Sequence, residues 1–291
     1  MEKHAAKHKT VGLALGGGAA KGIAHIGVIK ALEKAGIGID YISGTSMGAL
    51  VGGYYAATGD IIGLEKIMLN IKRKDIFSLK DIIKKRSGAF FRGDNIAEKL
   101  KEELGNFKIE DCKIPFVAIA TDVKNGDEVR LKSGSLIDAI RASIAVPIIF
   151  SPVEVDGKLL MDGGLVNPVP ADAAKELGAE FVVAVDVSSR WLETPEEMLN
   201  IKDMYSVIDQ SFSVLECQLA KNILKESADI VIKPPVVHHE WFEFGDSANL
   251  VKTGESETEL YISEIRKKTG HKKPFETFSE KFLDFILNKP H

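Results

Sequence analysis

The sequence of 291 residues has few cysteines and no long apolar run. Its two cysteines, Cys112 and Cys217, form no metal-binding or redox spacing. We expect both to be reduced, buried thiols, which favours a cytoplasmic compartment. No apolar run reaches the roughly 20 residues of a membrane-spanning helix. The stretch 1–10 is polar and basic, without the apolar segment of a secretory signal.

The sequence also has no excess of positive charge. Its net charge is −4, so we expect no nucleic acid as partner. With 45% apolar and 27% charged residues, the composition is ordinary for a globular protein. The length suffices for one large α/β domain or two small ones.

A serine lies at the centre of a G-x-S-x-G pattern in the stretch 41–49, which reads as a strand, a sharp turn and a helix. Gly44 and Gly48 flank Ser46 two residues away on each side, the spacing of a nucleophile elbow. Glycine suits both positions, because a Cβ atom so close to a strained turn would crowd it. A helix over 47–58 would point its N-terminus at the serine oxygen. A turn with an incidental serine is the alternative.

A run of three glycines, Gly16, Gly17 and Gly18, follows a predicted buried strand at 11–15. A dinucleotide-binding pattern would need a glycine where Lys21 stands, and no Gly-Lys-Ser/Thr follows to make a phosphate-binding loop. Successive glycine N–H groups at a helix start can instead stabilise developing negative charge as an oxyanion hole. We favour this role because the predicted elbow lies on the neighbouring strand, and a plain strand–helix turn remains the alternative.

A third stretch with glycines, Asp162-Gly163-Gly164, follows a predicted hairpin. Two glycines after an acid allow a tight turn, which can hold the carboxylate at a strand end. Taken alone, Asp-Gly-Gly is a common turn, and a purely structural role is its usual explanation.

Predicted strands and helices alternate along most of the chain. Apolar stretches at 11–15, 39–42, 114–121 and 181–187 read as buried strands. Helical periodicity marks most of the connections between them. This alternation predicts an α/β fold with a mainly parallel central sheet covered by helices on both faces.

We expect three parts in the chain: a polar tail at 1–10, a catalytic domain at 11–268 and an amphipathic C-terminal helix at 269–291. The last prediction rests on phenylalanines at three- and four-residue spacing. That helix could pack on the domain, on a second copy of the chain in a homo-oligomer, or on a membrane. Basic and apolar residues interleave at 72–92, which suits either an anionic membrane surface or a solvated helical connection.

The three stretches with glycines, in this order and each at a strand end, resemble the patatin-like phospholipase family and most of all its compact bacterial members. The resemblance covers 11–190 and continues more weakly to about 268. It extends to five further stretches, 24–28, 120–122, 139–143, 146–147 and 167–170. One departure is that two alanines separate Gly18 from Lys21, where many members have one residue. The identity of the oxyanion amides is therefore open by one residue.

The resemblance implies a three-layer α/β/α fold and a serine–aspartate dyad, with Ser46 as nucleophile and Asp162 as its base. The oxyanion amides would come from Gly17 and Gly18, with Gly16. Six further residues would support these motifs, Lys21, Gly22, Gly44, Gly48, Gly163 and Gly164. The implied activity is hydrolysis of lipid esters, as a phospholipase A or lysophospholipase, with no metal or cofactor.

No histidine is well placed for the Ser-Asp-His order of other serine hydrolases. The downstream histidines lie in a polar loop or in the tail, at His238, His239, His271 and His291. His25 lies upstream, on the predicted helix after the glycine run, where a packed and hydrogen-bonded role fits better. An aspartate with an ordinary pKa near 3.9 is a weak base, but it can serve when desolvated and close to the serine.

Two other functions stay open at this point. An acyltransferase would use the same kind of elbow but would want a catalytic histidine well beyond the serine. A non-catalytic or regulatory module would bind an acyl ligand or a nucleotide in the same pocket. For an enzyme, we expect a lipid or other ester as substrate. Peripheral contact with the inner face of a membrane is compatible with all of them.

Overall fold

The computed structural model describes residues 8–70, 99, 101–188, 204–236 and 244–272. Within them, eight strands form one sheet in the order β5-β6-β3-β2-β1-β7-β8, with β4 paired to β3. The strands are β1 (Val11–Leu15), β2 (Tyr41–Thr45), β3 (Phe116–Asp122), β4 (Glu128–Leu131), β5 (Val153–Val155), β6 (Lys158–Asp162), β7 (Phe181–Val185) and β8 (Ile230–Ile232).

The centre of the sheet is parallel, as predicted. Strands β3, β2, β1, β7 and β8 run in one direction. Strands β4 and β6 both pair antiparallel with β3, and β5 pairs antiparallel with β6 at the edge of the sheet. The carboxyl ends of β1 and β2 therefore lie side by side at one end of the sheet. Strand β6 runs the opposite way, and its last residue, Asp162, pairs with Ala120 near the same end.

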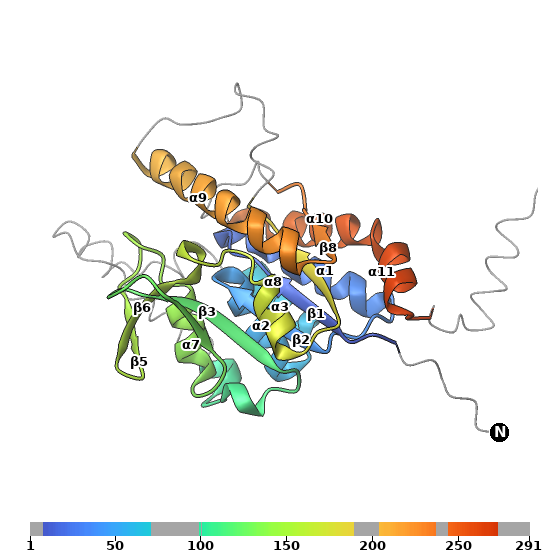
Figure 1. Cartoon of the computed structure of the whole chain (residues 1–291), viewed down its shortest axis with the longest axis horizontal. Coiled ribbons are helices and arrows are strands. Elements are labelled where there is room, and N and C mark those ends of the chain that lie inside the picture. The colour runs from blue at the N-terminus through green and yellow to red at the C-terminus, as the bar shows by residue number, and fades with distance from the viewer. Residues whose placement is uncertain (1–7, 71–98, 100, 189–203, 237–243, 273–291) are drawn as a thin grey trace, which may run out of the picture.

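Helices cover both faces of the sheet, which confirms the predicted three-layer architecture (Figure 1). One face carries α1, α2, α3, α7 and α10, and the other carries α8 and α9. Their bounds are α1 (Ala24–Lys34), α2 (Met47–Thr58), α3 (Ile61–Asn70), α7 (Leu136–Ser143), α8 (Ala171–Leu177), α9 (Met204–Ser227), α10 (Ser247–Glu259) and α11 (Ile262–Thr269). Short 3-10 helices occur at Ala19–Ile23, Ile109–Asp111, Gly163–Leu165 and Phe244–Asp246.

The alternation of side chains along β1 shows why both faces need covering. Leu13 and Leu15 point into the larger core, with α1 and α2, while Ala14 points into a smaller core with α8 and α9. All three side chains are fully buried. A strand that is apolar on both sides fits only between two layers of helices.

Some predicted element boundaries are wrong by a few residues. The strand predicted at 39–42 is β2 at Tyr41–Thr45, because the Asp40 carboxylate accepts a hydrogen bond from the Val11 amide at 2.7 Å and belongs to the connection. The helix predicted from about residue 20 begins as a 3-10 turn at Ala19–Ile23. The predicted catalytic domain, 11–268, closes on two helices, α10 and α11, and the second ends one residue beyond the predicted bound.

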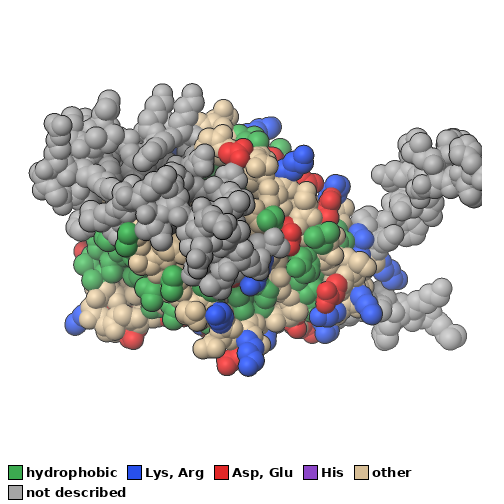
Figure 2. All heavy atoms as spheres, turned by 90° about the horizontal axis from the view of Figure 1, so that it is seen from above, with side chains coloured by type: hydrophobic (Ala, Val, Ile, Leu, Met, Phe, Trp, Pro, Cys, Tyr) green, Lys and Arg blue, Asp and Glu red, His purple; other side chains and the backbone are tan. Residues whose placement is uncertain are grey.

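Two predicted segments lie outside the described residues, the basic stretch 72–92 and all of the C-terminal helix beyond residue 272. In the described part of the chain, no helix combines the length and apolarity that a membrane span needs. On the face seen in Figure 2, acidic and basic side chains are interspersed, and hydrophobic side chains gather in small groups between them.

Candidate active site

Ser46 lies on a strained turn between β2 and α2. Its backbone has φ 54° and ψ −123°, a conformation that residues other than glycine rarely adopt. A Cβ atom at Gly44 would lie 2.5 Å from the Gly48 carbonyl oxygen, and one at Gly48 would lie 2.1 Å from the Leu15 carbonyl oxygen. Only glycine fits at these two positions, so the local geometry is that of a nucleophile elbow.

The turn is held from outside by Ser143, the last residue of α7. The Ser46 amide donates to Ser143 Oγ at 2.9 Å, and Ser143 Oγ donates to the Ile119 carbonyl at 2.6 Å. Ser143 is fully buried. The hydroxyl thus satisfies a buried amide at the turn and fixes it to β3. The sequence does not predict the contact itself, although Ser143 ends the stretch 139–143 that carries part of the family resemblance.

Asp162 is the last residue of β6 and lies almost entirely out of solvent, 5% exposed. Its Oδ1 atom accepts a hydrogen bond from the Gly164 amide at 2.8 Å. A Cβ atom at Gly163 would lie 2.3 Å from the Ile119 carbonyl oxygen, so the turn after Asp162 packs directly against β3. The two glycines let the chain turn this tightly and keep the carboxylate at the strand end.

Burial raises the pKa of Asp162 to about 6, although hydrogen bonding from the Gly164 amide and the Ser46 side chain opposes the increase. Within the described structure, the buried Oδ2 atom has no hydrogen-bond partner of ordinary geometry. The Ser46 side chain thus lies near enough to the carboxyl group to influence its pKa. The hydrogen bonds of catalytic groups are often long or poorly aligned before substrate binds.

Ser46 and Asp162 line one cleft, which we call the Ser46 cleft. Its other lining residues come from the glycine run, the loop after α7, the turn after β6 and helix α9. They are Gly18, Ala19, Val146, Pro147, Gly164, Leu165, Phe212 and Glu216. The structure therefore brings together the two residues that the sequence singled out for chemistry, from points 116 positions apart in the chain.

Of the three glycines predicted to contribute oxyanion amides, only Gly18 lines the cleft. The Gly16 amide donates to the Val185 carbonyl at 3.0 Å and the Gly17 amide to the Pro168 carbonyl at 2.9 Å. Both N–H groups are thus already used, which argues against their predicted oxyanion role. Gly18 and Ala19 line the cleft instead, at φ 152° and 47°. No acceptor for either amide is seen among the described residues.

Lys21 and Gly22 support the loop from behind. The Lys21 amide donates to the Gly18 carbonyl at 3.0 Å, and its mostly buried side chain is not part of the cleft lining. A Cβ atom at Gly22 would lie 2.5 Å from Cγ of Met47, the residue after the serine. These contacts pack the glycine run against the start of α2.

His25 has the packing role that the sequence favours. It is fully buried, and its Nε2 atom lies 2.8 Å from the Gly16 carbonyl oxygen, so a neutral ring donates there. Burial lowers the pKa of His25 to about 4. Among the described residues, no histidine lines the Ser46 cleft. His238, His239 and His291 lie outside that part of the chain.

Helix α9 supplies a wall of the cleft that the sequence does not predict. Phe212 and Glu216 lie one helical turn apart and both line it. They are distant in sequence from every glycine motif, and a phenylalanine and a glutamate in a long helix carry no spacing signal. Only the packing of α9 on the sheet reveals them.

A known protein family matches the part of the chain that carries the three glycine motifs. Residues 13–175, more than half of the chain, match the family described as "Patatin-like phospholipase". The chain belongs to the patatin-like phospholipase family. This family match contains the glycine run, the elbow and the Asp-Gly-Gly turn, and it confirms the resemblance that the sequence motifs indicated.

Curated members of the family share parts of this patatin-like chain. An uncharacterized NTE family protein of Mycobacterium tuberculosis is 40% identical over 178 residues, 61% of this chain and 49% of its own length. Lysophospholipase nte1 of Emericella nidulans is 29% identical over 305 residues, 96% of this chain and 20% of its own. The chain thus spans about half the length of the mycobacterial relative and a fifth of the fungal one.

Among solved structures, VipD from Legionella pneumophila resembles this patatin-like chain with a TM-score of 0.51 and 16% sequence identity. The likeness covers 89% of this chain and 67% of VipD. It concerns the fold alone and agrees with the three-layer α/β/α architecture.

Proposed function

We propose that this chain hydrolyses carboxylic esters of lipids, as a phospholipase A or lysophospholipase, through a dyad of Ser46 and Asp162. One observation carries the proposal: a serine on a strained turn and a buried carboxyl group with a raised pKa line the same cleft. Perturbed acids beside a nucleophile in a cleft are typical of catalytic sites.

In the first step, the Asp162 carboxylate accepts the hydroxyl proton of Ser46 while Ser46 Oγ attacks the ester carbonyl carbon. The carbonyl oxygen becomes an oxyanion, which the amides of Gly18 and Ala19 stabilise together with that of Met47, the residue after the nucleophile. The tetrahedral intermediate then collapses. The C–O bond to the alcohol breaks, and the alcohol takes the proton from Asp162.

In the second step, water attacks the acyl group on Ser46, and Asp162 accepts a proton from that water. Collapse of the second tetrahedral intermediate releases the acid and returns the proton to Ser46 Oγ. A carboxyl group whose pKa is about 6 suits both directions of transfer, because it is ionised near neutral pH yet basic enough to take a proton.

The lining of the cleft supports an apolar acyl group as substrate. Val146, Pro147, Leu165 and Phe212 present apolar surface beside Ser46. Burying an alkyl chain against such surface contributes about 0.8 kcal/mol for each CH₂ group. The name of the fungal relative, lysophospholipase, points to the same substrate class, although this chain matches only a fifth of that protein.

A fluorophosphonate probe and a panel of lipid esters test the proposal. We expect the probe to label wild type and the control Ser211→Ala, whose serine is exposed on α9 and bonded to Val207, but not Ser46→Ala. Asp162→Asn should keep the fold and lose at least about 100-fold in ester turnover. Labelling of Ser46→Ala at the wild-type rate would refute the assigned nucleophile.

Two results would favour the other functions. If wild type does not react with the probe but binds fatty acids, the chain is an acyl-binding module. If the acyl group leaves on an added alcohol or lysolipid in preference to water, the same acyl-enzyme serves an acyltransferase.

A further inference from the structure

Asn167 is bonded through its backbone to both motifs of the proposed dyad. Its carbonyl accepts a hydrogen bond from Thr45 Oγ1 at 2.7 Å, and Thr45 directly precedes Ser46. Its amide donates to the Gly163 carbonyl at 2.9 Å, and Gly163 directly follows Asp162. One residue thus connects the two strand ends that carry the hydroxyl and the carboxyl group.

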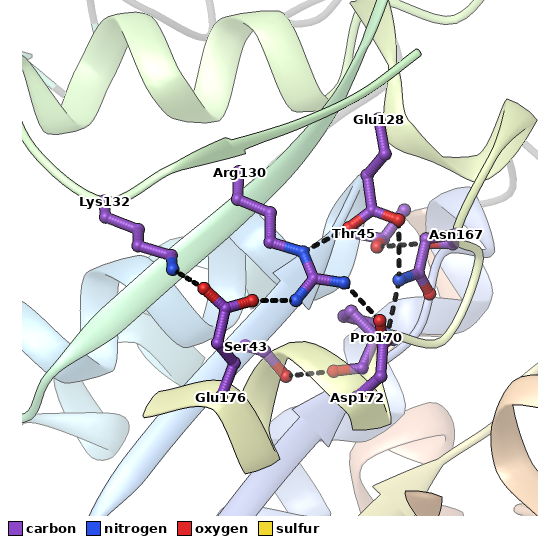
Figure 3. Close-up of polar contacts among 9 residues, drawn as sticks. All are labelled: Ser43, Thr45, Glu128, Arg130, Lys132, Asn167, Pro170, Asp172 and Glu176. Carbon is purple, nitrogen blue, oxygen red and sulfur yellow. Dashed lines mark hydrogen bonds and ion pairs between the residues drawn. The ribbon is translucent and has the colours of Figure 1, made fainter. Parts of the chain in front are cut away.

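The side chain of Asn167 is held on the other side by two carboxylates (Figure 3). Its Nδ2 atom donates to Asp172 Oδ1 at 2.8 Å and to Glu128 Oε2 at 3.2 Å. Asn167 is fully buried. An amide has two N–H donors on one nitrogen, so asparagine can satisfy both acids at once.

Arg130 in turn holds these two carboxylates in place. Its Nε donates to Glu128 Oε1 at 2.6 Å, and its terminal nitrogens pair with Asp172 and Glu176, as Figure 3 shows. A guanidinium group is planar and has five donors in fixed directions, so it can orient several acids together. We call Glu128, Arg130 and Asp172 the Arg130 cluster. It fastens β4 and α8 around the Asn167 side chain.

A parallel contact strengthens the same connection. Ser43, on β2, is buried and donates from Oγ to the Pro170 carbonyl at 2.7 Å. The segment 167–170 is therefore fixed to β2 at two points, at Thr45 and at Ser43. Among the contacts described for this segment, the side-chain amide of Asn167 is the group that bonds to the Arg130 cluster.

We propose that Asn167 is a positioning residue that sets the separation of the Ser46 hydroxyl and the Asp162 carboxyl group, with the Arg130 cluster holding Asn167 in place. The inference rests on the proposed dyad. Without the side-chain hydrogen bonds, the backbone hydrogen bonds of Asn167 could still form. The two strand ends would, however, shift relative to each other. A misplacement of about 1 Å at a reacting centre can lower a rate about 100-fold.

The test replaces Asn167 with alanine and measures hydrolysis of a soluble p-nitrophenyl ester. We expect kcat to fall about 10- to 100-fold and KM to change less than about threefold, because the cleft lining is untouched. The rate of fluorophosphonate labelling should fall in parallel. Titrating reactive sites with the probe to completion gives the folded, competent fraction, and kcat is divided by it.

Lys132→Gln is the matched control. Lys132 lies on the same side of the hairpin and pairs with Glu176 at its exposed end, without contact to Asn167 (Figure 3). Its kcat should stay within about twofold of wild type. Arg130→Gln should lose activity as Asn167→Ala does. The double variant should lose no more than Asn167→Ala alone, since both changes release the same contact.

Three outcomes would overturn the inference. The first is a corrected kcat of Asn167→Ala within twofold of wild type, and the second is an equal loss in Lys132→Gln. The third is an additive loss in the double variant, which would separate Arg130 from Asn167. Failure of the proposed function would look different, because wild type would then show no ester turnover or Ser46→Ala would keep it.

Discussion

At the scale of single residues, the ionisation of Asp162 should govern activity. If its carboxylate is the base, kcat/KM rises about tenfold per pH unit below the pKa near 6 and levels off above it. The pH profile of soluble-ester hydrolysis measures this, with unfolding checked at each pH. A profile that is flat from pH 5 to pH 8 would contradict the assignment.

The same pKa predicts an effect on stability. Because the folded-state pKa of Asp162, about 6, lies above the unfolded value near 3.9, ionisation costs free energy in the folded protein. The cost is absent below pH 3.9 and complete above pH 6. Asp162→Asn should therefore raise the free energy of unfolding by about 3 kcal/mol at pH 8, with a gain that shrinks as pH falls toward 4. Urea unfolding of both proteins at several pH values checks this, and a gain independent of pH would speak against it.

The sequence predicted some residues of the site and not others, for physical reasons. Ser46 and Asp162 lie in turns whose glycines are required by backbone contacts, so their surroundings leave a pattern in the sequence. The amides proposed for the oxyanion leave no such pattern, because every residue except proline has a backbone N–H group. Only the bonds that Gly16 and Gly17 make to Val185 and Pro168 show which amides remain. Both carbonyl groups belong to segments more than 150 positions further along the chain, a strand end and a connection.

At the scale of elements, α10 packs on α1 through its backbone. A Cβ atom at Gly254 would lie 2.0 Å from the Ala24 carbonyl oxygen, and one at Gly27 would lie 1.9 Å from the Val251 carbonyl oxygen. We expect Gly254→Ala to lower the free energy of unfolding by at least about 2 kcal/mol, since neither backbone can move aside cheaply. Urea unfolding measures it.

The control is Gly245→Ala, at an exposed position where an added Cβ meets nothing within 4 Å. It should change the free energy of unfolding by less than about 0.5 kcal/mol. Equal effects of the two substitutions would contradict the close approach of α1 and α10.

Apolar periodicity predicted most elements but not how they meet. The α2 helix has the predicted bounds, 47–58, because a strained turn begins it and Gly59, at φ 66°, ends it. The crossing of α10 over α1 has no such local cause. It depends on Gly27 and Gly254, which lie 227 positions apart, and neither glycine is required by the backbone conformation of its own helix.

At the scale of the whole molecule, the stretch that carries the motifs is not a complete fold. The smaller core joins Ala14 and Val182 of the sheet to Ala220 and Leu224 of α9. A chain ending at residue 190 would lack α9, β8 and α10 and expose both faces of the sheet. We expect it to bind a hydrophobic dye and to show no cooperative thermal unfolding. A sharp transition like that of the full chain would contradict this.

The cleft beside Ser46 is built from two separate parts of the chain, the turns that carry the motifs and helix α9. Bond breaking is assigned to turns in the first 165 residues, whereas Phe212 and Glu216 shape the opening from a helix far downstream. If the proposed function holds, substitutions at Phe212 and Glu216 could change which lipid the cleft accepts while the dyad of Ser46 and Asp162 stays the same.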